Sequence, residues 1–436
     1  MKKIVLSAIA GLALGTVALN AAAITLYEDA NGQVFTKPAV GRTELVITTD
    51  MITNKVQKDE SYSTPRIIKL SKEDKAQLKQ ELLAEVKKAT PIFSKSDKLK
   101  FSTLSYLGYT FNNRESGLKN DESNFEIRRS YFQVKAYLLD DPKSYYRITF
   151  DAHQNAEDDL VLRTKYAYLY LNNILPYTGI ELGLVHRPWH DYEEHNAWYY
   201  RSISKVLIEA KNGADLSNSA DFGFNLKTKT KYFDSEIGLF NGEGYHSDDN
   251  DDNDDTSSQG MSLEWRTTAH LMGVNGKDKQ TKKTYLDASF FGQYNVKHKA
   301  DSLAPNGYDD LIFMGIHAVY NQPNFLISAQ YIYSDDTAEN STYVSKQSGS
   351  GYSINSEFRF GKQKEYRIIG RYDLWTKEQL SGVKETDNKT YLGALAWEQN
   401  ENLQWLANVI VTDNEDGSSR ENENGTQYMF TAEVKF

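Results

Sequence analysis

The chain has 436 residues, no Cys, a formal net charge of -10 and an aromatic share of 12%. This acidity argues against nucleic-acid binding, for which a basic stripe is expected. The absence of Cys excludes disulfides as a source of stability. Mean hydropathy is only -0.62, yet the chain contains 29 Tyr and 19 Phe. A membrane β-barrel reconciles these values, because only alternate strand residues are apolar and aromatic residues gather at the two membrane interfaces.

The first residues have the pattern of a secretory signal. Lys2 and Lys3 precede an apolar stretch at 4–19, and three Ala at 21–23 form a small-residue cleavage site. We therefore expect residues 1–23 to be a signal peptide and the protein to be exported. No later stretch reaches the ~18 consecutive apolar residues of a transmembrane helix.

Residues 24–97 differ from the rest and are expected to form a periplasmic N-terminal segment. Short β-rich pieces between turn signals occupy 24–50. A helix is predicted over 71–89, with Ser71 as N-cap and Pro91 beyond its end. Its narrow apolar stripe leaves two alternatives open, self-association and a solvated linker helix.

Residues 98–436 predict a series of strands with one apolar and one polar face. In the segment 402–412, Leu403, Trp405 and Ala407 fall on one parity, and Gln404 and Asn408 on the other. Successive side chains of a strand point to opposite faces of the sheet, so this alternation indicates one apolar face. Most segments approach or exceed the ~9–11 residues that cross a bilayer at a tilt. Sixteen strands are expected, at 98–112, 125–139, 144–154, 162–172, 179–187, 219–230, 232–240, 259–272, 283–298, 310–321, 324–334, 350–361, 364–375, 389–398, 402–412 and 426–436.

The connections alternate between short and long. Outer-membrane barrels place short turns on the periplasmic side and long loops outside, whereas a soluble sandwich has no reason to segregate loop lengths. The connection at 273–282 is an exception, because it is long for a periplasmic turn. The predicted fold class is an all-β transmembrane antiparallel up-and-down barrel of about sixteen strands, which encloses an aqueous channel.

The last segment, 426–436, ends on an aromatic residue of the apolar parity, Phe436. It resembles the closing strand of bacterial outer-membrane barrels, whose last residue assists recognition by the barrel assembly machinery. We therefore assign Phe436 a role in assembly.

The long connection after the fifth strand is too apolar to extend freely into water. It contains Val206, Leu207 and Ile208 beside charges of both signs. We expect the stretch at about 188–218 to fold into the lumen and form a constriction. The candidate constriction residues are Trp189, His190, Asp191, Glu193, Glu194 and His195.

Four stretches carry a resemblance to a known family: 125–135 (FEIRRSYFQVK), 183–189 (GLVHRPW), 192–195 (YEEH) and 241–245 (NGEGY). Over roughly residues 98–436 the chain resembles the phosphate-selective porin (O and P type) family and its general relatives. This resemblance implies a homotrimer of sixteen-stranded barrels in the outer membrane, with an in-folded third loop and rows of Arg and Lys that guide anions. The family's phosphate-contacting residues cannot be matched one by one.

Strand parity and the in-folded loop give the candidate anion-guiding residues. For Arg163 and Lys165 parity is ambiguous, because Tyr166, Tyr168 and Tyr170 form either a girdle or a lumen face. The alternative reading is that these cations pair with carboxylates across the lumen. The candidates are Arg129, Lys135, Arg147, Arg163, Lys165, Arg187, Arg201, Lys205, Lys211, Arg367 and Arg371.

Metal and catalytic motifs are weak. His190 and His195 match no HExxH spacing. The acidic run at 248–255 lacks the spaced Gly and bidentate Glu of a calcium loop, and we interpret it as a solvated extracellular loop. We therefore expect no metal, no cofactor and no enzymatic activity.

The leading hypothesis is an outer-membrane porin that passes small hydrophilic solutes, with a possible preference for anions such as phosphate. The alternative is a non-conducting outer-membrane barrel that acts in adhesion or envelope anchoring. Either protein would contact outer-membrane lipid and lipopolysaccharide.

Overall fold

The computed structural model describes residues 24–29, 34–35, 42–47, 54–57, 66–69, 98–114, 122–137, 139, 141–154, 159–242, 244–245, 260–273, 279–300, 307–336, 348–377, 386–416 and 421–436. The expected signal peptide at 1–23, the expected helix at 71–89 and the acidic run at 248–255 lie outside the described residues. The chain divides into two compact units, residues 1–98 and 99–436.

The described residues of the N-terminal unit form five short strands. β1 (Ile24–Asp29) lies between β2 (Val34–Phe35) and β3 (Arg42–Ile47) in an antiparallel sheet, and β4 (Asn54–Gln57) pairs with β5 (Arg66–Lys69).

The second unit is a closed antiparallel barrel of sixteen strands, as the alternation predicts. Each strand is found within three residues of its expected bounds. The connection between β13 and β14 contains a short 3-10 turn, η2 (Gln280–Lys282), and a second, η3 (Glu421–Glu423), precedes the last strand. The strands are β6 (Leu99–Arg114), β7 (Glu122–Ala136), β8 (Tyr145–Gln154), β9 (Leu160–Leu175), β10 (Thr178–His186), β11 (Ala220–Lys229), β12 (Phe233–Phe240), β13 (Ser262–Gly273), β14 (Tyr285–Ala300), β15 (Tyr308–Gln322), β16 (Phe325–Asp336), β17 (Gly349–Phe360), β18 (Tyr366–Lys377), β19 (Thr386–Asn400), β20 (Leu403–Asn414) and β21 (Gly425–Lys435).

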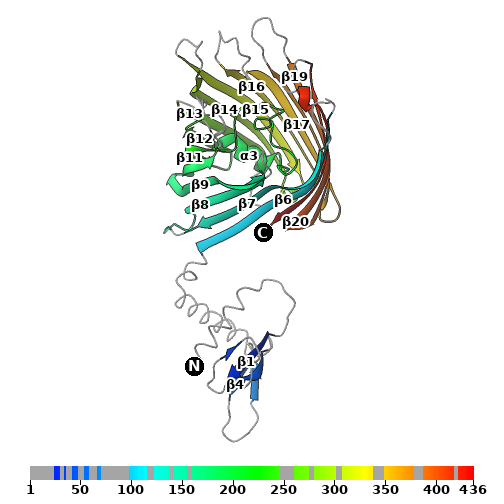
Figure 1. The fold of residues 1–436 in the computed structure, drawn as a ribbon. Coiled ribbons are helices and arrows are strands. Elements are labelled where there is room, and N and C mark those ends of the chain that lie inside the picture. Colours follow the sequence, from blue (N-terminus) through cyan, green and yellow to red (C-terminus); the bar gives the residue numbers. More distant parts are fainter. Residues whose placement is uncertain are drawn as a thin grey trace. The chain divides into compact units, whose positions relative to one another are not determined.

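The barrel closes where β21 pairs with β6, and Figure 1 shows the C-terminus beside these strands. Phe436 continues this ladder beyond β21. Its N–H donates to the carbonyl of Thr103 at 3.2 Å, and the N–H of Thr103 donates to the carbonyl of Phe436 at 2.9 Å. Closure leaves the sheet without a free edge, which is how a barrel satisfies its backbone groups in lipid.

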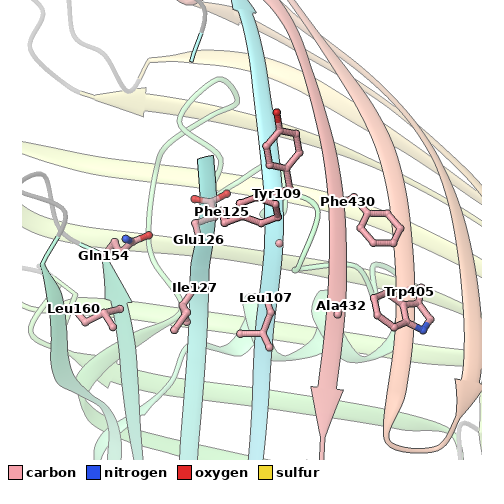
Figure 2. Close-up of a pocket in the computed structure, with 11 residues that line it drawn as sticks. Leu107, Tyr109, Phe125, Glu126, Ile127, Gln154, Leu160, Trp405, Phe430 and Ala432 are labelled. Atoms are coloured by element: carbon pink, nitrogen blue, oxygen red, sulfur yellow. The ribbon is translucent and has the colours of Figure 1, made fainter. Parts of the chain in front are cut away.

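The outer face of the barrel is apolar. Phe125, Leu162 and Phe430 are all exposed there, as expected for side chains that face lipid. A hollow of about 440 Å³ lies on this face across β6 to β9, β20 and β21. Figure 2 shows Tyr109 and Phe125 near one end of the hollow, and Trp405 and Phe430 on one side.

Two β-bulges change the alternation that the sequence predicts. In β7 the pairing with β6 passes from Arg129 to Ile127, so Arg128 is an extra residue. In β9 the pairing with β8 passes from Tyr166 to Thr164, so Lys165 is an extra residue. A bulge re-aims side chains locally, and these two place adjacent residues on the inner face together.

One helix, α3 (Pro188–Asn196), lies inside the barrel outline (Figure 1). No helix among the described residues is long and apolar enough to cross a membrane. α3 begins the connection at 187–219 between β10 and β11, which we call the inner loop.

Candidate functional site in the barrel lumen

The inner loop enters the lumen at a buried ion pair. Arg187 Nε donates to Glu264 Oε1 on β13 at 2.8 Å, and its Nη2 donates to Gln293 on β14 at 3.2 Å. Pro188 follows at the first position of α3, where its missing N–H leaves no helical bond unmade. Arg187, a predicted anion-guiding residue, is therefore enclosed and paired with a carboxylate.

Wall side chains anchor the inner loop around the barrel. Arg128 donates to the carbonyl of Ser202 at 2.5 Å, and Arg371 donates to the carbonyl of Lys205 at 2.8 Å. The Tyr192 hydroxyl donates to Asp287 at 2.9 Å, and the Asn212 amide donates to Thr390 at 2.8 Å. These contacts come from β7, β14, β18 and β19, so the loop is tied to widely separated parts of the wall.

Apolar packing places the inner loop on one side of the lumen. Trp189 stacks on Phe291 of β14 with ring centroids 3.6 Å apart. Val206, Leu207 and Ile208 are fully buried in the same cluster. The wall contributes side chains that strand parity assigns to a polar lumen face, among them Ile332, Ile369 and Leu406. Their apolar character follows from the loop that covers them.

A cavity of about 900 Å³ remains beside the inner loop. Its wall residues come mainly from β6 to β13, and the loop contributes residues of α3 and the segment after it. The lining is rich in Tyr and in charges of both signs, for example Tyr168, Arg147 and Glu236.

Several predicted cations are paired with carboxylates inside the lumen. Arg129 lies 2.6 Å from Asp151, and Arg163 lies 3.7 Å from the same group. Arg201 forms a two-point contact with Glu209 at 2.7 and 2.9 Å, and also contacts Glu194. Lys205 lies 3.1 Å from Glu209. These residues match the alternative in which cations and carboxylates neutralise each other.

The carboxyl of Glu209 is ionised by its partners. Burial alone would raise its pKa, but the charges of Arg201 and Lys205 lower the pKa of Glu209 well below the usual value. The reciprocal attraction of Glu194 and Glu209 outweighs burial and raises the pKa of Arg201. The cluster therefore carries fixed and largely compensated charges.

Three of the predicted cations that line the cavity have no carboxylate partner among the described residues: Lys135, Arg147 and Lys165. Their contacts are aromatic or neutral. Lys135 Nζ lies 4.6 Å from the Tyr145 ring centroid, and the Arg147 guanidinium lies 4.6 Å from that of Tyr166. Arg147 also donates to the Tyr168 hydroxyl at 3.2 Å. The bulge at Lys165 resolves the ambiguity of β9, because Lys165, Tyr166 and Tyr168 all line the cavity.

The charged face of α3 meets a wall lysine that strand parity alone did not single out. Lys227 lies 3.1 Å from Asp191, and 3.5 Å from both Glu181 and Glu236. Burial would raise the pKa of Asp191, but Lys227 and two His residues lower the pKa well below its usual value. His195 stands at the exposed end of α3, with its Nδ1 3.4 Å from Asp191.

His190 and Glu193 point away from the cavity into the packed side of the loop. Burial lowers the pKa of His190 to about 3, so the ring is neutral and its Nε2–H donates to the carbonyl of Ser217 at 3.2 Å. Burial raises the pKa of Glu193 to about 8, although Arg371 opposes the shift. No three His, Asp or Glu side chains in the described part of the chain are arranged to hold one metal ion.

The remaining candidates are separated from the open cavity. Arg371 is buried against Asp373 at 2.7 Å, and Arg367 contacts Glu357 at 3.5 Å and also Glu398. Both face inward, as parity predicts. Lys211 is exposed.

Several inward charges were absent from the predicted set. Arg266 contacts Glu236 at 2.8 Å, and Arg359 contacts Glu357 at 2.7 Å. The alternation of β13 and β17 contains the signal for both, since Arg359 lies between the outward Phe358 and Phe360, and Arg266 follows the outward Trp265. Arg128 gives no such signal, because only the bulge turns it inward.

A closed sixteen-stranded barrel with an apolar exterior, a charged lumen and an in-folded loop has the fold of the outer-membrane porins. An anion-selective porin from Comamonas acidovorans aligns with TM-score 0.53 and 11% identity, covering 77% of this chain and 98% of that chain. Salmonella typhi OmpF, in a complex with daunomycin, aligns with TM-score 0.53 and 13% identity, covering 78% and 97%. The trimer form of the Vibrio cholerae outer membrane protein OmpT aligns with TM-score 0.50 and 10% identity, covering 78% and 100%. No protein-family model and no curated protein matches the chain.

Proposed function

We propose that the chain is a bacterial outer-membrane porin, which lets small hydrophilic solutes diffuse through its lumen with a preference for anions. The observation that carries the proposal is the 900 Å³ cavity with charged walls inside a barrel whose outer face is apolar. An apolar outer face suits lipid, and a polar interior suits water and dissolved ions.

The anion preference rests on the imbalance of charge pairing. Eight Lys or Arg side chains line the cavity against six Asp or Glu side chains. Lys135, Arg147 and Lys165 form no ion pair with a described carboxylate, whereas the cavity's Glu181, Asp191 and Glu236 contact Lys227 or Arg266. A fixed charge inside a low-dielectric wall focuses its field into the pore and attracts ions of opposite sign. The similarity in fold to an anion-selective porin is consistent with this preference.

Conductance tests the proposal. The detergent-purified full chain is inserted into a planar bilayer, and single-channel currents and the reversal potential in a KCl gradient are recorded. Stepwise conductance with a reversal potential on the anion side supports the proposal. A closed trace would contradict it and favour the non-conducting barrel in adhesion or anchoring.

Assembly as a homotrimer is part of the same proposal, since the resemblance of the sequence implies it and one similar barrel is described as a trimer form. Native mass measurement in detergent tests it independently of conduction. A monomer at all protein concentrations would contradict trimer assembly and would leave the channel proposal standing.

A further inference from the structure

Three lumen cations lie side by side on three adjacent strands. Lys135 on β7 is paired in register with Lys100 on β6 and with Arg147 on β8. We call these three residues the basic row. Directly opposed residues have Cβ atoms ~5 Å apart, and like charges in that position repel each other.

The basic row is only partly compensated, because Asp191 attracts Lys135 and Arg147 from beyond ion-pair distance. None of the three side chains forms an ion pair with a described carboxylate. Each cation instead lies near a Tyr ring: Lys100 Nζ is 5.0 Å from the Tyr137 centroid, Lys135 Nζ is 4.6 Å from Tyr145, and Arg147 is 4.6 Å from Tyr166. Hydrogen bonds from Arg147 go to Thr149 at 3.0 Å, to Tyr168 at 3.2 Å and to His186 Nε2 at 2.9 Å, and none goes to a carboxylate.

Three acids of the cavity contact a lysine outside the basic row. Glu181 and Asp191 are within 3.5 Å of Lys227, which also contacts Glu236. The fold therefore retains a row of mutually repelling cations, two of which, Lys135 and Arg147, line the cavity. An anion from solution relieves that repulsion, and charge-assisted hydrogen bonds to Lys and Arg would hold it.

The geometry of the basic row selects the kind of anion. Neighbouring strands lie ~4.8 Å apart, so Lys100 and Arg147 are separated by two strand spacings, roughly 10 Å. An anion with a single acidic group can contact only two neighbouring cations of the basic row. An elongated anion with an acidic group at each end reaches all three, since Lys side chains are flexible and the Arg fork suits a carboxylate.

We propose that the basic row is a binding subsite for aliphatic dicarboxylates on the path of solutes through the barrel. Lys100 and Arg147 hold the two carboxylates, and Lys135 lies between them. The position on the path depends on the proposed channel function, whereas the binding itself does not. Lys135 lies at the end of β7 that leads into the short connection to β8, and Lys100 is paired with it, so the subsite is near that mouth of the barrel.

Calorimetric titration of the folded full chain in detergent tests the subsite with succinate, acetate and inorganic phosphate as probes. We expect succinate to bind at least about tenfold more tightly than acetate, with phosphate weaker than succinate. Lys100→Gln and Arg147→Gln should each weaken succinate binding about tenfold. Lys135→Arg keeps the charge and should retain binding.

Lys362→Gln is the matched control, because it removes one charge from an exposed short turn between β17 and β18 and should leave succinate binding unchanged. Heat-modifiable migration on gels verifies that each variant is folded. Three outcomes would overturn the subsite. They are equal affinity for succinate and acetate, tighter binding of phosphate than of succinate, and equal effects of the row variants and the control. Succinate binding without conductance contradicts the channel function alone, and conductance without succinate binding contradicts the subsite alone.

Discussion

The guanidinium of Arg371 lies 4.7 Å from the ring centroid of Trp198, so a wall residue of β18 contacts the inner loop through its side chain as well as through the carbonyl of Lys205. Asp373 holds the same guanidinium at 2.7 Å. Arg371 was predicted to guide anions, and its contacts show that it also anchors the loop.

Arg371→Ala should loosen the inner loop and destabilise the barrel by about 3–5 kcal/mol, because removal of one partner leaves the buried Asp373 uncompensated. We expect the barrel to unfold at a lower temperature, as measured by its change in migration on gels. We also expect noisier single-channel currents. Lys362→Ala, at an exposed position in the turn between β17 and β18, is the control. A variant that combines Arg371→Met with Asp373→Leu should recover part of the stability but not the steady current.

Arg147→Glu should shift the reversal potential toward cations by a larger amount than Arg201→Glu. Arg147 has no carboxylate partner among the described residues, so the substitution reverses an uncompensated charge in the cavity. Arg201 is already neutralised by Glu209 and Glu194. Reversal potentials in a KCl gradient compare the two variants. A larger shift for Arg201→Glu would show that the loop charges govern selectivity.

Stability should fall as pH rises through about 8 because of Glu193. Burial, its largest cause, raises the pKa of this carboxyl from 4.5 to about 8 in the folded protein. Between these two pKa values the folded state holds a proton that the unfolded state has lost. The contribution of protonated Glu193 to the free energy of unfolding is therefore complete below about pH 4.5 and lost above about pH 8. Unfolding in denaturant at several pH values measures this. Glu193→Gln should flatten the profile, and an unchanged slope would contradict the assignment.

Deletion of Phe436 should reduce the yield of assembled barrel more than it alters the conductance of barrels that form. The deletion removes the two backbone hydrogen bonds with Thr103 that continue the closing ladder, and an exposed aromatic residue. Heat-modifiable migration of membrane extracts measures assembly. Phe436→Tyr keeps both features and should assemble normally, whereas normal assembly of the deletion would remove Phe436 from this role.

Much of the barrel could be predicted from residue alternation. The strand period of two is a local property. The apolar and polar faces of segments such as 402–412 and 426–436 can therefore be assigned from their own residues alone. Loop lengths then imply an antiparallel order. The inward placement of Arg367 and Arg371 follows from the same parity.

The pairing of charges could not be predicted, because it depends on register and on bulges. One extra residue in a strand changes which side chains share a face, and nothing in the sequence marks Arg128 or Lys165 as that residue. Contacts between Arg187 and Glu264, 77 residues apart, likewise arise only in the closed barrel.

The sequence by itself determined the sixteen strands, their apolar outer face and an inner loop too apolar for water. Tertiary structure decided where that loop rests, which explains apolar lumen positions such as Ile369 and Leu406. It also decided which cavity-lining cations have no carboxylate partner among the described residues, namely Lys135, Arg147 and Lys165. The physical reason is that burial and charge compensation are properties of neighbours in space, and the closed barrel brings together side chains from strands far apart in the chain.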